Sequence, residues 1–126
     1  MSLLAVAVAA HHGTSEYDMN KEVRLTGSVK EWAFRNPHSW LKLSVTPEKG
    51  ATEEWTIESA PPSYLSNQGW SISTLKAGEK LTAVISPKRG QANSGILLEV
   101  QRAAGELLIV RPRGSFGRPA STEPAK

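Results

Sequence analysis

The strongest constraint on the fold is a strict alternation of apolar and polar residues in two stretches. In "VRLTGSV" (23–29) every second residue from Val23 is apolar or glycine, and in "WLKLSV" (40–45) Leu41 and Val45 share one face. A period of two is typical of a strand with one buried and one solvated face. Gly27, inside the first stretch, predicts a bulge or a sharp bend of the kind that small barrels use at corners.

Further strands and one helix follow the two alternating stretches. The sequence predicts a helix over Ser63–Gln68 that opens after two prolines and stops at Gly69, and strands over residues 53–59, 81–87, 96–103 and 106–110. Short strands at intervals of roughly 8–12 residues with one helical insert are typical of a small barrel or sandwich. A helix between the third and fourth strands matches the five-stranded Greek-key barrel of the oligonucleotide/oligosaccharide-binding (OB) type. We therefore expect an all-β fold with minor helical content: an OB-like barrel of five to six strands.

The basic charge is confined to the end of the chain. Residues 111–126 carry the whole formal net charge of +3, and the remainder holds as many acidic as basic residues. By net charge alone, the body therefore shows no sign of nucleic-acid binding. We expect a barrel domain over residues 11–110 and a disordered basic tail over 111–126, which is rich in proline, glycine and serine.

The apolar run at residues 3–10 is interpreted as the remnant of a signal peptide. Ala7-Val8-Ala9 fits the small-residue pattern at a cleavage site, although a basic n-region is missing. The alternative is an N-terminal strand, which the alanine content disfavours. The run is also shorter than the ~18 residues that a transmembrane helix needs. The sequence predicts a periplasmic or secreted protein without a transmembrane segment.

Two adjacent histidines follow the expected cleavage site. Cleavage beside Ala10 would expose an α-amine next to His11 and His12, and an amine with imidazole suits Cu(II) better than zinc or nickel. His38 would complete the site, with Asp18 or Glu58 as a fourth ligand or a supporting group. The hypothesis is a copper site, and it requires His38 to lie near residues 11–18. The alternative is that His11 and His12 are solvated and bind nothing specific.

The turn "NPH" (36–38) lies among tryptophans and permits a second hypothesis. Trp40, Asn36 and Trp70 could bind an oligosaccharide, a peptide or a partner protein on the barrel face. Trp70 could instead anchor the core. Glu58 could face His38 across the sheet, which would be required for acid–base catalysis. No nucleophile or cofactor motif accompanies the pair, so the sequence favours binding over catalysis.

These motifs together resemble a family of small exported bacterial proteins of unknown function. Its members carry an Ala-His-His start after a signal peptide, then Tyr-Asp, an Asn-Pro-His turn and a Gly-Trp pair. The resemblance covers about residues 9–100 and implies an exported barrel-like domain without an assigned activity. The spacing between Trp32 and the Asn-Pro-His turn is longer here than is usual in the family. The matching positions are His11, His12, Tyr17, Asp18, Asn36, Pro37, His38, Glu58, Gly69 and Trp70.

Overall fold

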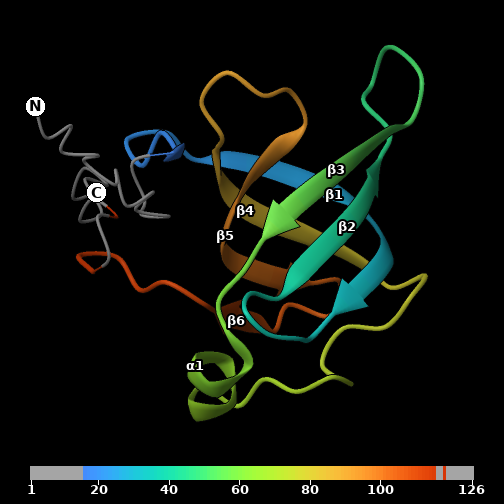
Figure 1. Cartoon of the computed structure of the whole chain (residues 1–126). Coiled ribbons are helices and arrows are strands. Elements are labelled where there is room, and N and C mark those ends of the chain that lie inside the picture. Colours follow the sequence, from blue (N-terminus) through green and yellow to red (C-terminus); the bar gives the residue numbers. More distant parts are fainter. Residues whose placement is uncertain (1–15, 116–117, 119–126) are drawn as a thin grey trace, which may run out of the picture.

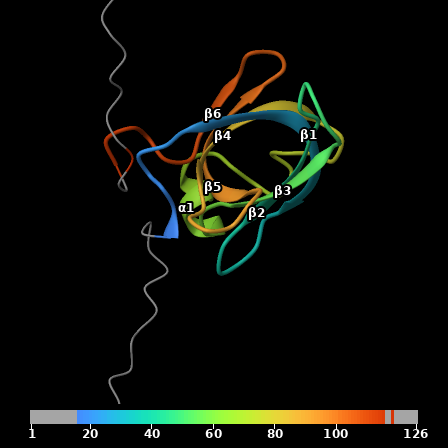
Figure 2. The same cartoon turned by 90° about the horizontal axis from the view of Figure 1, so that it is seen from above.

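A computed structural model describes residues 16–115 and residue 118 (Figure 1). The elements are β1 (Val23–Ala33), β2 (Trp40–Val45), β3 (Glu53–Glu58), α1 (Pro62–Asn67), β4 (Lys80–Pro87), β5 (Ser94–Arg102) and β6 (Leu107–Ile109). Five strands form a closed barrel in the order β3-β2-β1-β4-β5, and the sixth pairs with β5. The parallel pairing of β3 with β5 closes the ring that Figure 2 shows from above. The predicted OB-like barrel, with its helix between the third and fourth strands, is confirmed.

The alternating faces of the strands fill the inside of the barrel. Each of the five barrel strands contributes buried side chains to the core, and α1 adds Leu65 to the same core. α1 begins at Pro62, where proline costs no backbone hydrogen bond, and Gly69 with φ of +86° follows its last turn. The core contains Leu25, Val29, Leu41, Leu43, Val45, Ile57, Leu65, Trp70, Leu81, Ala83, Ile85, Leu97 and Val100.

Strand β1 is long enough to serve two neighbours. Its first half pairs with β4 and its second half with β2, and Gly27 belongs to both ladders. The register shift lies between Val29 and Glu31, so the bulge is not at Gly27, where the sequence predicted a bulge or bend. Gly27 instead allows close approach: a Cβ there would lie 2.2 Å from the carbonyl oxygen of Ser44.

The segment before β1 covers part of the outside of the barrel. Tyr17 and Met19 lie in a mostly polar stretch of the sequence, yet they are buried with Val84, Ile96 and Leu98 in a second apolar cluster. A backbone bridge between Tyr17 and Lys88 fixes the segment beside the end of β4. This explains why β4 and β5 are buried on both faces, unlike the alternating pattern of β2.

The segment after β6 also packs on the barrel, for the residues that the structure describes. The Arg118 side chain is 1 % exposed and pairs with Glu22 and Glu99, and Arg113 pairs with the same two carboxylates. Arg113 and Arg118 belong to the stretch predicted as a basic tail, and these ion pairs join them to the barrel. Composition predicted a solvated end because the acidic partners lie far away in the sequence. Among the described residues, no helix is long and apolar enough to cross a membrane.

Candidate functional site

A hollow of about 390 Å³ lies where the start of β2 meets the end of β3. The antiparallel register pairs Trp40 with Glu58, so the residues just before β2 and at the end of β3 become neighbours. The Tyr17–Lys88 bridge brings the segment before β1 to the same place. The lining residues are Glu16, Tyr17, Pro37, His38, Trp40, Glu58 and Lys88.

Glu58 contacts both Tyr17 and His38 in this hollow. One carboxylate oxygen, Oε1, lies 2.8 Å from His38 Nδ1, and the other, Oε2, accepts a hydrogen bond from the Tyr17 hydroxyl. The side chains of His38 and Glu58 are 35 % and 15 % exposed. The expectation that Glu58 faces His38 across the sheet is confirmed. We refer to Tyr17, Glu58 and His38 as the Glu58 relay.

The Glu58 relay fixes which nitrogen of His38 faces outward. A carboxylate only accepts hydrogen bonds, so the 2.8 Å approach of Nδ1 to Oε1 favours the tautomer of His38 that carries its proton on Nδ1. In the neutral ring the lone pair then resides on Nε2, which is the nitrogen that can bind a metal ion or accept a proton. His38 directly follows the turn before β2, in which the Asn36–Pro37 peptide bond is cis.

Tyr17 remains a hydrogen-bond donor throughout the physiological pH range. Burial, followed by the hydrogen bond to Glu58 and its negative charge, raises the pKa of the Tyr17 phenol well above its usual value. The residue is 4 % exposed. Tyr17 is one of the positions that match the family resemblance, but sequence reasoning did not assign it to the site. An aromatic residue within an otherwise polar segment is the sequence signal that could have identified it.

Arg111 supplies positive charge close to the Glu58 relay. Burial lowers the pKa of its guanidinium, and the charges of Tyr64, Glu58 and Tyr17 act in the opposite direction. Sequence reasoning missed this residue because it placed Arg111 in the tail. Its interaction with Glu58 depends on β6, which places the end of the chain beside the barrel.

Of the other residues predicted for the copper site, only Asp18 lies in the part of the chain that the structure describes. Asp18 does not line the hollow; its carboxylate lies 3.8 Å from Arg89 and 3.9 Å from Lys21. His11 and His12 lie outside the described residues. The copper hypothesis requires His38 to lie near residues 11–18. Of these residues, Glu16 and Tyr17 line the hollow together with His38. The described residues contain no group of three or more metal-ligating side chains.

The three residues predicted for partner binding, Asn36, Trp40 and Trp70, do not form one surface. Asn36 is exposed in the turn, and Trp40 is half-buried beside two hollows. Trp70 is 3 % exposed, its ring lies 5.5 Å from that of Trp32, and its Nε1 donates to the Ile109 carbonyl at 3.4 Å. This buried position agrees with the core-anchor alternative and leaves Trp70 little surface for a ligand.

The chain matches a model of a protein family over most of its length. Residues 1–98 match the model of a family described as "Family of unknown function (DUF6152)". No curated protein and no solved structure matches the chain.

Proposed function

The chain belongs to the family of unknown function DUF6152, and from that premise we propose that it is an exported barrel protein that binds a copper ion with His38. The observation that carries the proposal is the Glu58 relay, in which a carboxylate orients the histidine from behind. Histidines that bind metals nearly always donate their second ring N–H to a carboxylate, a carbonyl or water, which fixes the ring and raises its basicity.

The remaining ligands would come from the start of the mature chain. Glu16 lines the hollow, and His12 and His11 precede it by four and five residues. An extended chain spans up to ~3.6 Å per residue, so roughly 14 to 18 Å is within their reach. Signal-peptide cleavage beside Ala10 would add an α-amine. Nitrogen ligands of this kind favour Cu(II) among the divalent metals.

The first experiment establishes the mature N-terminus and its affinity for copper. The protein is exported in a bacterial host, its N-terminus is determined by intact mass, and the purified chain is titrated with Cu(II). A chain that starts at Ala10 or His11 and binds one Cu(II) at sub-micromolar strength supports the proposal. An uncleaved chain, or a cleaved chain that does not bind Cu(II), contradicts the proposal.

Variants separate a site built on the barrel from a simple N-terminal chelate. His38→Ala should remove the strong binding, and Glu58→Gln should weaken it about 10- to 100-fold because the supporting carboxylate is lost. Glu54→Gln is the matched control: it removes a carboxylate of the same strand that pairs with Lys30 outside the hollow and should leave affinity unchanged. If His38→Ala binds copper as well as the parent does, the barrel plays no part and the proposal fails.

A further inference from the structure

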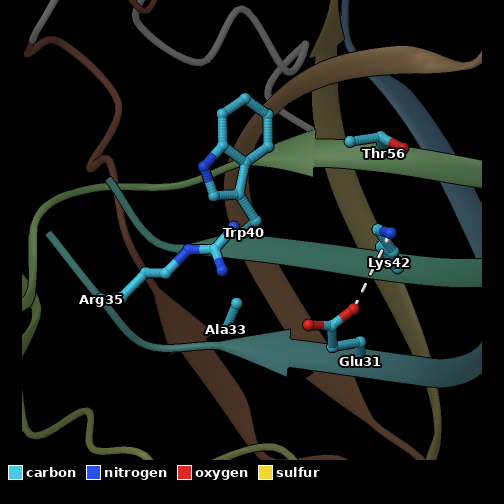
Figure 3. A pocket seen from close by; sticks show the side chains of 6 residues that line it. All are labelled: Glu31, Ala33, Arg35, Trp40, Lys42 and Thr56. Carbon is cyan, nitrogen blue, oxygen red and sulfur yellow. Dashed lines mark ion pairs between the residues drawn. The ribbon is translucent and has the colours of Figure 1, made fainter. Parts of the chain in front are cut away.

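A second hollow lies on the outer face of β1, β2 and β3 (Figure 3). It has a volume of about 400 Å³ and is lined by Glu31, Ala33, Arg35, Trp40, Lys42 and Thr56. The strand register explains the grouping, because Ala33 pairs with Trp40, Glu31 with Lys42, and Lys42 with Thr56. The hollow is thus a continuous patch across three strands, which we call the outer hollow.

The indole of Trp40 forms the apolar wall of the outer hollow. Ala33, its partner across the ladder, is small and leaves room beside the ring. Figure 3 shows the Arg35 side chain reaching from beyond the end of β1 toward Trp40. A flat aromatic surface beside polar groups binds ligands that have both an apolar face and polar edges.

The polar groups of the outer hollow provide one uncompensated positive charge. Lys42 lies 3.8 Å from Glu31, so these two charges offset each other. Arg35 has no ion-pair partner within the part of the chain that the structure describes. A guanidinium without an ion-pair partner can bind a carboxylate of a ligand through two parallel hydrogen bonds.

The remaining lining groups decide between classes of anion. Glu31 and Thr56 can exchange hydrogen bonds with hydroxyl groups. The Glu31 carboxylate repels the closely spaced phosphates of a nucleic acid, and the chain outside its last sixteen residues has no net charge to offset that repulsion. A ring with hydroxyl groups and a single carboxylate fits better than a polyphosphate does.

We propose that the outer hollow binds an acidic saccharide, with a uronic-acid ring against Trp40 and its carboxylate on Arg35. The same face of the OB-type barrel binds oligosaccharides and oligonucleotides in other proteins, which is an analogy of fold only. The proposal is independent of copper, because it requires neither His38 nor any residue before residue 16.

The test is a calorimetric titration of the full chain with trigalacturonate in the presence of a metal chelator. The matched probe is the same trisaccharide with its carboxylates methyl-esterified, which keeps the rings and removes the charge. We expect binding of the acid and a loss of about tenfold or more for the ester, since a hydrogen bond to a charged group contributes about 1.5–3 kcal/mol.

Two variants locate the binding. Arg35→Gln should weaken trigalacturonate binding about tenfold or more, whereas Lys49→Gln, which removes an exposed positive charge from the β2–β3 connection, should not. Equal binding of acid and ester, an unaffected Arg35→Gln variant, or no binding at millimolar trigalacturonate would each overturn the proposal. Tighter binding of an oligodeoxythymidylate than of trigalacturonate would also overturn it.

Discussion

At the residue scale, Glu58 connects two donors with different functions. Tyr17 donates to one of its oxygens and His38 lies against the other, so both carboxylate oxygens are engaged. A half-buried carboxylate with both oxygens in contact with neighbours has little freedom to rotate. Tyr17 therefore positions His38 through Glu58.

Tyr17→Phe tests this positioning role. The variant removes the hydroxyl and leaves Glu58 Oε2 without that donor, so we expect a loss of about 1–3 kcal/mol in the free energy of unfolding. We also expect a weaker preference for the proton on Nδ1 of His38, measured by ¹⁵N chemical shifts of the imidazole at a pH where the ring is neutral.

Tyr64→Phe is the control for this measurement. It removes a hydroxyl that donates to the Val110 carbonyl at 3.0 Å, on a residue that does not line the hollow. The control should lose stability without altering the imidazole shifts of His38. If both variants leave these shifts unchanged, Tyr17 has only a structural role.

At the element scale, β1 holds the barrel together because it pairs with β2 and β4 at once. Both ladders pass through Gly27, which faces Val45 on one side and Leu81 on the other. The backbone of β2 approaches so closely that a Cβ on Gly27 would lie 2.2 Å from Ser44 O and 2.9 Å from Ser44 C. The contact is with backbone, which cannot move aside without disturbing the ladder.

Gly27→Ala should therefore destabilise the barrel by about 3 kcal/mol or more, since it overpacks the fold against the backbone. The comparison variant is Gly90→Ala, at a position with φ of +70° and no atom near its would-be Cβ. It should cost only about 1–2 kcal/mol, from the left-handed backbone alone. Urea denaturation of both variants measures the difference, and equal midpoints would contradict the role assigned to Gly27.

At the scale of the whole molecule, the two segments outside the barrel are joined to it by charge. Glu22 precedes β1, Glu99 lies on β5, and Arg113 and Arg118 follow β6. Arg118 Nε lies 2.9 Å from Glu22 Oε1, and its Nη2 also donates to Glu99. These contacts neutralise part of the charge that the composition placed in a free tail.

The pairing predicts a specific loss of stability in acid. Burial by itself raises the pKa of Glu22, but the hydrogen bonds and charges of Arg118 and Arg113 outweigh it and hold that pKa below the ordinary 4.5. A carboxyl with a depressed pKa stabilises the fold above its unfolded-state pKa. That contribution disappears as the pH falls from about 4.5 through the lower pKa of the folded state.

Arg118→Gln should reduce the free energy of unfolding at pH 7 by about 2–4 kcal/mol, because it leaves two carboxylates with only Arg113. It should also flatten the decline of stability below pH 4.5, measured by urea denaturation at a series of pH values. Arg24→Gln, which removes an exposed contact with Gln101, is the control and should retain the parent's pH profile. If the free energy of unfolding of Arg118→Gln falls more steeply below pH 4.5 than that of the parent, the pairing is not the cause of the loss of stability in acid.

The sequence by itself determined the elements of this protein. Alternation in β1 and β2, together with the prolines and the glycine around α1, indicates each element because these signals act between neighbouring residues. The proximity of His38 and Glu58 could also be predicted from the sequence, since a hairpin between consecutive strands places the start of one beside the end of the next.

Only the tertiary structure decided which other groups complete the site. Tyr17 donates to a carboxylate 41 residues away, and Arg118 pairs with one 96 residues away. Arg111 approaches Glu58 only because β6 returns the chain to the barrel. No local pattern encodes such contacts, because their energy comes from burial and charge between segments that only the closed barrel places together.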